Sequence, residues 1–598
     1  MPLITRRAPI FGRDMERTGP TEVGLFVPPE EIFPGVEGTE RALVEVLGTL
    51  SRDDTLIHAA RLNTLISGSG DFDAHGRQKL AVRWLCTNAQ AKSLNDFVGR
   101  YQGAGPVTVF FPGQIRELMR WTARHCKNLP GDGNTFSKRE RLDNFVKALL
   151  IAGMLWSYRT YGDKLSGGGD LAAIRQRAIG AFRKGVEEGN LAPHLGIALG
   201  RGRALFIDYL PARYPEFAEA FERATGMPLD QYRSCVAALS VYTLYNKKEG
   251  PLFLSQSVAA TTTRRDVFPT YFALEGQSPE ELAVSLWEDF DTKGYRALRE
   301  KPILITKDGR AIILDPTFFG EKISIGPLFH VLKGADRAKG NEMFGKFGLA
   351  FEDYATSILK RMYPSRPGLI DRMAYGLRGA DAQGQEFEID ASLTDVTESA
   401  VFEMKAAWLR EDAMIDDTPD RLLSDIRSKY GVNPAAKGER PKGVAQLARS
   451  VGAIVRGEWL GPNREFAHST VIYPVLVVHD TRLDAPALAH FLDKEFRLLL
   501  DTFPSGQRVA PLTIMTIQDL ENLESSVANF SFVDLLAAYS RECPDRLRSL
   551  HNFIAYSEFG KKVLPNSYLM ESSQEILELL QRELFPGVNI PSAAPQTN

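Results

Sequence analysis

Two short alternating runs separated by a polar loop constrain the fold of this chain more than any other feature. Residues 386–393 read EFEIDASL and residues 400–406 read AVFEMKA, so every second residue of each run is apolar. Successive side chains of a strand point to opposite faces, so each run predicts a strand with an apolar core face and a second face. The core faces would carry Phe387, Ile389, Ala391 and Leu393 in the first run, and Phe402, Met404 and Ala406 in the second.

The second faces of the two strands carry charged residues that this pairing brings together. If residues 394–399 form the turn, the strands pair antiparallel, Leu393 lies near Ala400, and Asp390 faces Glu403 at about 5 Å. Glu403 and Lys405 lie on the same face, about 7 Å apart. Two carboxylates so placed repel unless a cation lies between them, and Mg²⁺ is a hard cation that takes oxygen ligands. The hairpin therefore predicts a metal site, with Lys405 holding a water molecule beside it.

This arrangement resembles the PD-(D/E)XK phosphodiesterase superfamily, the restriction-endonuclease-like nucleases, whose motif is an aspartate on one strand and Glu-x-Lys on the next. Asp390 matches the aspartate, and Glu403-Met404-Lys405 is the only Glu-x-Lys in the chain. The resemblance implies an α/β restriction-endonuclease-like core, with a mixed central sheet flanked by helices. It would accompany a large, mainly α-helical N-terminal region.

Two further site residues are implied by the same resemblance. Family members often carry an acid on the preceding helix, and Glu352 lies in residues 345–363, where Phe351, Tyr354, Ile358 and Leu359 form an apolar stripe. They also often place a glutamine or basic residue on the following helix, where it contacts the scissile phosphate or a metal-bound water. Residues 442–455 predict that helix, and Gln446 is the candidate.

The expected reaction is metal-dependent hydrolysis of a phosphodiester bond. Asp390 and Glu403, with the carbonyl of Met404 and with Glu352, would hold one or two Mg²⁺ ions, for which Mn²⁺ can substitute. Lys405 would orient and help deprotonate the attacking water. By resemblance, in-line attack would expel the 3′ oxygen and leave a 5′ phosphate. DNA is the expected substrate, and RNA stays open.

The segments after the motif predict the rest of an α/β core. Residues 470–478 read TVIYPVLVV, an unbroken apolar run typical of a strand buried on both faces. A helix is predicted over residues 485–500 and a strand over residues 509–517.

The remaining sequence suggests a division into several domains, since 598 residues exceed the usual size of one. The strongest turn signal outside the motif is Asp308-Gly309, which predicts a hairpin between two apolar runs in residues 301–316, followed by a strand and a helix in residues 320–335. We expect an extended arm over 1–40, a helical recognition or regulatory domain over 41–270, a small β-containing connector over 271–340, the nuclease domain over 341–520, and a helical extension with a disordered tail over 521–598.

Composition and charge bear on where the protein is located and which partners it can bind. We find no apolar run long enough to cross a membrane, no secretory signal and no metal-binding spacing among the four cysteines, so we expect a cytoplasmic protein without a membrane partner. A net charge of −3 means that any nucleic-acid contact must be a local patch. Arg116, Arg120 and Arg124 recur at every fourth residue and predict a solvated basic helix face, with a nucleic-acid contact as the alternative.

Several functional readings stay open at this level. The layout resembles bacterial defence nucleases that act on phage or foreign DNA. The alternatives are a non-catalytic nucleic-acid-binding scaffold, or a nuclease subunit that acts only with a partner ATPase or sensor. Cutting both strands of DNA would favour a homo-oligomer. Residues 340–347 (GNEMFGKF) imitate a phosphate-binding loop but lack its Ser or Thr, and His479-Asp480 is interpreted as a capped strand end.

Overall fold

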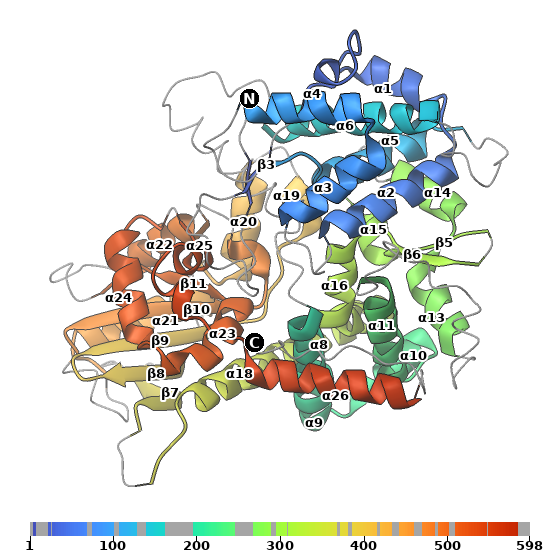
Figure 1. The fold of residues 1–598 in the computed structure, drawn as a ribbon. Coiled ribbons are helices and arrows are strands. Elements are labelled where there is room, and N and C mark those ends of the chain that lie inside the picture. Colours follow the sequence, from blue (N-terminus) through green and yellow to red (C-terminus); the bar gives the residue numbers. More distant parts are fainter. Residues whose placement is uncertain are drawn as a thin grey trace.

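Helices make up most of the residues that the structure describes, beside one larger and two smaller sheets (Figure 1). The computed structural model describes residues 4–6, 22–24, 27–67, 74–100, 107–127, 139–161, 195–244, 267–288, 295–307, 309–367, 371–380, 386–415, 419–432, 442–459, 469–484, 488–500, 509–546 and 548–583.

The largest sheet is mixed and has five strands in the order β11-β10-β9-β8-β7. Strands β7, β8 and β9 form an antiparallel meander, whereas β9, β10 and β11 run parallel. The predicted register is confirmed, because Leu393 of β8 faces Ala400 of β9. The strands are β7 (Met373–Ala380), β8 (Glu386–Asp395), β9 (Glu398–Lys405), β10 (Val471–Val478) and β11 (Thr513–Thr516).

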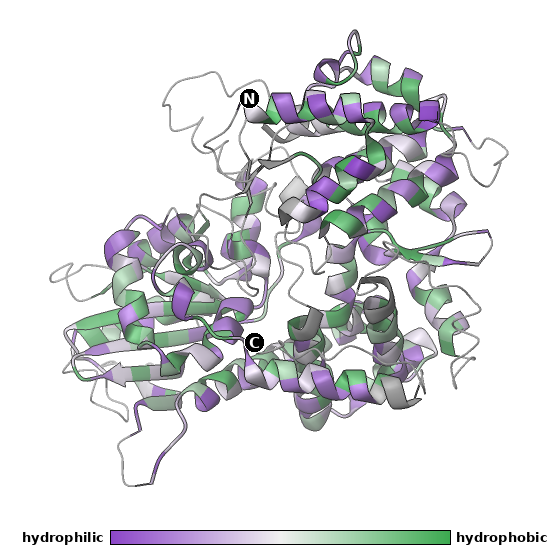
Figure 2. Ribbon diagram, viewed as in Figure 1, coloured by the Kyte–Doolittle hydropathy of each residue, from purple (hydrophilic) through white to green (hydrophobic). Residues whose placement is uncertain are grey.

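Helices cover both faces of this sheet. Phe402 of β9 packs on Phe532, at a ring-centroid distance of 5.8 Å, whereas the neighbouring Val401 belongs to a separate core with Val444. Every residue of β10 after Val471 is buried, so the strand buried on both faces is confirmed. Figure 2 shows hydrophobic stretches, in green, along the strands of this sheet. The first face carries α18 (Arg337–Met362), α23 (Ile517–Glu524), α24 (Phe532–Glu542) and α25 (Leu550–Ala555), and the second carries α20 (Pro419–Lys429), α21 (Gly443–Val455) and α22 (Leu488–Leu499).

The N-terminal half is largely helical, as its sequence predicts. One core gathers around α5 and α6, and a second joins α8 to α11 with the first face of the sheet. These helices are α1 (Glu40–Leu47), α2 (Arg52–Ser67), α3 (Ala74–Leu85), α4 (Asn88–Gly99), α5 (Pro112–His125), α6 (Arg139–Tyr161), α8 (Leu195–Arg203), α9 (Leu210–Arg213), α10 (Glu216–Thr225), α11 (Leu229–Leu244), α13 (Val267–Glu275), α14 (Pro279–Glu288), α15 (Arg296–Glu300), α16 (Pro316–Ser324) and α17 (Gly326–Gly334).

The C-terminal helix packs against a helix of the N-terminal half. Helix α26 (Ser567–Glu583) packs along α8 (Figure 1), and a Cβ on Gly200 would lie 2.6 Å from the carbonyl oxygen of Leu569. Only a residue without a side chain allows this approach. The C-terminal helix therefore returns to the helical half instead of extending away from the sheet.

The predicted hairpin at residues 301–316 is confirmed. Strands β5 (Ile303–Ile305) and β6 (Ala311–Ile313) pair antiparallel, and β4 (Gly276–Gln277) completes a three-stranded sheet. Gly309 takes a φ of 74°, the left-handed conformation that glycine adopts without strain. The second small sheet joins β1 (Ile4–Arg6), β2 (Glu22–Gly24) and β3 (Val107–Thr108).

One predicted strand and two predicted boundaries are wrong. The strand expected in residues 320–335 is absent, because Asp315 caps the backbone N–H groups of Thr317 and Phe318 and starts helix α16. Helix α18 begins at Arg337 instead of residue 345, so Glu352 lies in its middle. Strand β11 ends at Thr516, whose hydroxyl forms a capping box with Asp519 and begins α23.

The predicted solvated basic face is also wrong. Arg116 is fully buried and its Nε lies 2.6 Å from a carboxylate oxygen of Asp315, and Arg120 is buried against Glu117. Arg124 lies over the ring of Trp287. Arg116 and Arg120 are therefore not available to a nucleic acid, and Arg124 is partly buried.

Some expectations fall on residues outside the described ranges, namely the C-terminal tail after residue 583 and about half of the arm over residues 1–40. None of the described helices is both long enough and apolar enough to cross a membrane.

Candidate active site

Strands β8 and β9 separate part-way along the central sheet, and the predicted site lies where they separate. The two strands pair from Asp395 and Glu398 as far as Ala391 and Phe402. Beyond that point β8 pairs only with β7, while β9 pairs with β10 as far as Lys405. Asp390 is the next residue of one branch, and Glu403 to Lys405 form the other. We call this opening the strand fork.

The fork also shifts the side-chain pattern of β8, so one prediction is wrong. Ala391 packs into the core on the α18 side, whereas Ile389 and Phe387 pack into the core on the α21 side. Across from Asp390, Gly376 of β7 takes a φ of 56°, which glycine adopts easily. This irregular backbone lets both strands exchange faces, so the four apolar residues of β8 do not share one face. The expected faces of β9 are confirmed, with Phe402, Met404 and Ala406 in one core and Val401 in the other.

Asp390 is held in the fork by the backbone of β9. Its Oδ2 accepts a hydrogen bond from the N–H of Met404 at 2.6 Å, which replaces the strand pairing lost at this position. The pKa of Asp390 is raised to about 6, mainly by burial and further by the negative charge of Glu388, although Lys405 opposes the shift. Its Oδ1 accepts no hydrogen bond from any described residue and is free to bind a cation.

Glu403 is almost completely buried, with an exposure of 5%. Its Oε1 accepts a hydrogen bond from the N–H of Gly443, the first residue of α21, at 3.2 Å. A helix N-terminus favours a negative charge. Burial nonetheless raises the pKa of Glu403 well above its usual range, and the charges of Asp390 and Glu352 raise it further. The site therefore stores electrostatic repulsion that a cation would relieve.

Glu352 reaches the same site from α18. Its pKa is raised to about 7, first by burial and then by the charge of Asp390, while Lys405 lowers it. The structure thus brings Glu352, Asp390, Glu403 and Lys405 within electrostatic reach of one another, as the sequence motif predicts.

Lys405 and Gln446 complete the set of predicted residues. Lys405 is the last residue of β9 and is partly buried, and its ammonium forms no ion pair with a described residue. Gln446 donates from Nε2 to the backbone carbonyl of Glu388 at 3.2 Å. It therefore lies beside the strand that carries Asp390, where its amide fixes α21 against the fork.

The donor set at the fork suits Mg²⁺ as a partial shell. Within the described ranges, no three His, Cys, Asp or Glu side chains converge closely enough to hold a metal ion by themselves. Mg²⁺, however, is usually bound through one or two carboxylates and completes its shell with water and substrate phosphate. Asp390 and Glu403 each keep one oxygen that accepts no hydrogen bond from a described residue, so the two carboxylates fit that role.

Gly443 is a site residue that the sequence reasoning missed. It takes a φ of 57°, and a Cβ there would lie 2.3 Å from the carbonyl oxygen of Tyr430. A Cβ on Gly431 would lie 2.0 Å from the carbonyl oxygen of Lys442, so the two glycines let the chain before α21 pass against the end of α20. A glycine at the start of a predicted helix, in a segment otherwise typical of one, was the available signal.

Asp480 has the structural role predicted for it. Its carboxylate accepts from the backbone N–H of Leu409 at 3.0 Å and binds Arg482 at 2.6 Å, which caps the ends of β9 and β10. His479 differs, since neither of its buried ring nitrogens has a hydrogen-bond partner among the described residues.

Neither a protein-family model nor a curated protein sequence matches the chain. The likeness to restriction-endonuclease-like nucleases therefore rests on the residues of the fork and their arrangement.

Proposed function

We propose that this protein is a Mg²⁺-dependent nuclease with a restriction-endonuclease-like core that hydrolyses phosphodiester bonds of DNA. The observation that carries the proposal is the strand fork, where Asp390 and the Glu403-Met404-Lys405 segment leave the regular ladder and meet Glu352 of α18. Buried carboxylates without neutralising partners are costly in a purely structural setting. Their presence at one opening of the sheet supports a site that works with a cation.

Each fork residue has a distinct task in this reaction. Asp390 and Glu403 hold the metal through their free oxygens, and Glu352 acts directly or through water. When bound, the ion neutralises the phosphate and the negative charge that develops on it. Lys405 orients the attacking water and helps to deprotonate it, and Gln446 keeps α21 in place beside the phosphate. Water forms a new bond to phosphorus, the P–O3′ bond breaks, and the 3′ oxygen takes a proton.

The helical half of the chain supports an enzyme whose activity is regulated. A helical half of comparable size packs on the sheet through a shared core. Arg116 and Arg120 on α5 are buried and do not contact DNA in this proposal, in which the phosphate binds at the fork. We propose a role in bacterial defence from this layout, and activation by a partner ATPase or sensor fits the same layout.

The test is cleavage of plasmid, linear duplex and single-stranded DNA, and of RNA, with Mg²⁺, Mn²⁺ or EDTA. We expect metal-dependent cleavage of DNA by the wild type, lowered about 100-fold or more in Lys405→Ala. Lys494→Ala, which removes an exposed lysine of α22, is the matched control and should cleave as the wild type does. Cleavage by Lys405→Ala at the wild-type rate would refute the site. Binding of DNA without cleavage would favour the scaffold alternative.

A further inference from the structure

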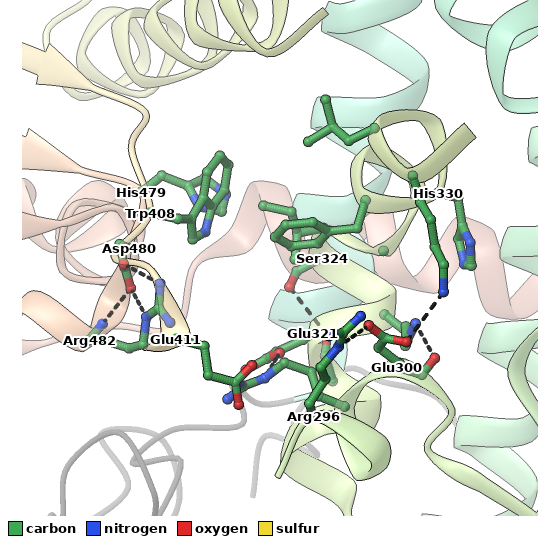
Figure 3. A pocket seen from close by; sticks show the side chains of 18 of the residues that line it. Arg296, Glu300, Glu321, Ser324, His330, Trp408, Glu411, His479, Asp480 and Arg482 are labelled. Carbon is green, nitrogen blue, oxygen red and sulfur yellow. Dashed lines mark hydrogen bonds and ion pairs between the residues drawn. The ribbon is translucent and has the colours of Figure 1, made fainter. Parts of the chain in front are cut away.

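A cavity of about 1030 Å³ separates the sheet from the helices α16 and α17 (Figure 3). One wall follows the carboxyl ends of the parallel strands β9 and β10, which Trp408 and His479 extend. The other includes Glu300 and His330 from the helical half. Its volume is at the upper end of the range for small-molecule sites, about 300–1,000 Å³, and ligands often bind outside the carboxyl ends of such strands.

The cavity has a strongly positive lining in a chain of net charge −3. Nine Lys or Arg residues border it, against four Asp or Glu residues. Several of these cations are neutralised within the wall, as Arg482 is by Asp480. Lys301 and Lys429 are not neutralised in this way, because neither ammonium forms an ion pair with any residue that the structure describes. They come from opposite walls, so an anion between them would meet two available positive charges.

The cavity also offers aromatic surface and an unsatisfied polar group. Trp408 and Phe329 line it, and the Phe329 side chain is 46% exposed. Trp408 lies against His479, at a centroid distance of 4.7 Å. Both ring nitrogens of His479 are buried and have no partner among the described residues, and the cost of burying them would fall if a ligand supplied hydrogen bonds.

We propose that this cavity binds a nucleotide, with its phosphates between Lys301 and Lys429 and its base against Trp408, within hydrogen-bonding reach of His479. Cationic and aromatic groups together suit a ligand that has both a phosphate and a planar ring. The site is distinct from the fork, because none of Glu352, Asp390, Glu403, Lys405 and Gln446 lines the cavity.

The two sites are joined through the backbone. The N–H of His479 donates to the carbonyl of Lys405 at 3.3 Å, and Trp408 follows Lys405 by three residues. A nucleotide that orders Trp408 and His479 therefore also orders the end of β9. Nucleotide binding stands by itself, whereas its effect on cleavage rests on the proposed function.

The test measures binding of ATP and GTP that carry a fluorescent methylanthraniloyl group, in EDTA, by energy transfer from tryptophan. We expect saturable binding, weakened about tenfold or more by Lys429→Glu and by Lys301→Glu, and energy transfer reduced in Trp408→Phe. Lys494→Glu on α22 is the matched control and should bind as the wild type does.

The inference would be overturned by the absence of saturable binding of both nucleotides. It would also be overturned by equal binding by the wild type and both cavity variants. The fork variants Asp390→Asn and Lys405→Ala should keep full binding. Loss of binding in those variants, with displacement by single-stranded DNA, would place the nucleotide at the fork instead. Binding by a protein that cleaves no nucleic acid would refute the nuclease and leave the nucleotide site standing.

Discussion

Arg201 and Glu521 form a buried ion pair that ties the helical half of the protein to the helices on the central sheet. Nε of Arg201, on α8, donates to Oε1 of Glu521, on α23, at 2.6 Å. The hydroxyl of Tyr354 donates to the same oxygen at 2.7 Å. Tyr354 lies two residues beyond Glu352 on α18, so this network connects the helical half to a helix of the strand fork.

Glu521→Gln should destabilise the protein strongly. It leaves the guanidinium of Arg201 buried without its counter-charge, which costs about 3–5 kcal/mol. Thermal and denaturant unfolding would measure the loss. Glu45→Gln, which breaks the exposed pair with Arg41, is the control and should leave stability unchanged. If the double variant Arg201→Met/Glu521→Leu were no more stable than Glu521→Gln, the unpaired charge would not be the cause.

Asp390→Asn should separate stability from activity. The amide oxygen can still accept the Met404 N–H, while the like-charge repulsion with Glu403 is removed. We expect the melting temperature in EDTA to stay unchanged or to rise, and cleavage to fall about 100-fold or more. Mg²⁺ should raise the melting temperature of the wild type and not that of the variant. An equal Mg²⁺ shift in both proteins would show that Asp390 is not a ligand.

Gly443→Ala should disturb the fork through the backbone at the start of α21. Its Cβ would lie 2.3 Å from the carbonyl oxygen of Tyr430, so the start of α21 must move and the hydrogen bond to Glu403 is lost. We expect a loss of about 2 kcal/mol in unfolding free energy together with reduced cleavage.

Gly457→Ala, at the other end of α21, is the matched control for this change. It also has a positive φ, of 71°, but meets no atom within 4 Å. It should cost about 1 kcal/mol and leave cleavage intact. If Gly457→Ala reduced cleavage as much as Gly443→Ala, contact with Glu403 would not be the reason.

His479 should make the protein sensitive to mild acid. Its pKa is lowered from 6.5 to about 3, chiefly by burial and further by the positive charges of Arg201 and Arg482, while Asp480 opposes the shift. The rings of Phe347, Phe351 and Trp408 surround it and carry no charge. Below pH 6.5 His479 is protonated in the unfolded state, whereas in the folded state it stays neutral until near pH 3. Stability is therefore lost as the pH falls through this window, by about 2 kcal/mol between pH 7 and pH 5.

His479→Gln should remove this part of the acid sensitivity, measured as unfolding free energy against pH. Trp408→Phe disturbs the same aromatic contacts without changing a titratable group, so it should keep the wild-type pH dependence. The same slope in His479→Gln and in the wild type would contradict the assignment.

Local patterns in the sequence predicted several elements well. The alternating runs at β8 and β9 set the register of Leu393 against Ala400, and the unbroken apolar run of β10 indicated a strand covered on both sides. The Asp-Gly turn at residue 309 and the helix that carries Gln446 were equally clear. These features depend on neighbours in sequence or on burial alone, so a local pattern is sufficient to indicate them.

The errors arose where a distant partner decides the outcome. Arg116 looked like part of a solvated basic face, yet its partner Asp315 lies 199 residues further along the chain. Phe387 and Ile389 share the alternation of Ala391, but they pack on the opposite face, beyond the irregular backbone of Gly376 in the neighbouring strand.

The sequence by itself determined which strand residues could meet at one site, because the positions of Asp390, Glu403 and Lys405 follow from the period of two strands. Only the tertiary structure decided that β8 and β9 part at these residues, that α18 brings Glu352 to them, and that α21 gives Glu403 a backbone partner. It also created the cavity beside Trp408 and His479. Periodicity reports which way a side chain faces, whereas the opening of a sheet and the approach of distant helices depend on packing between segments far apart in the chain.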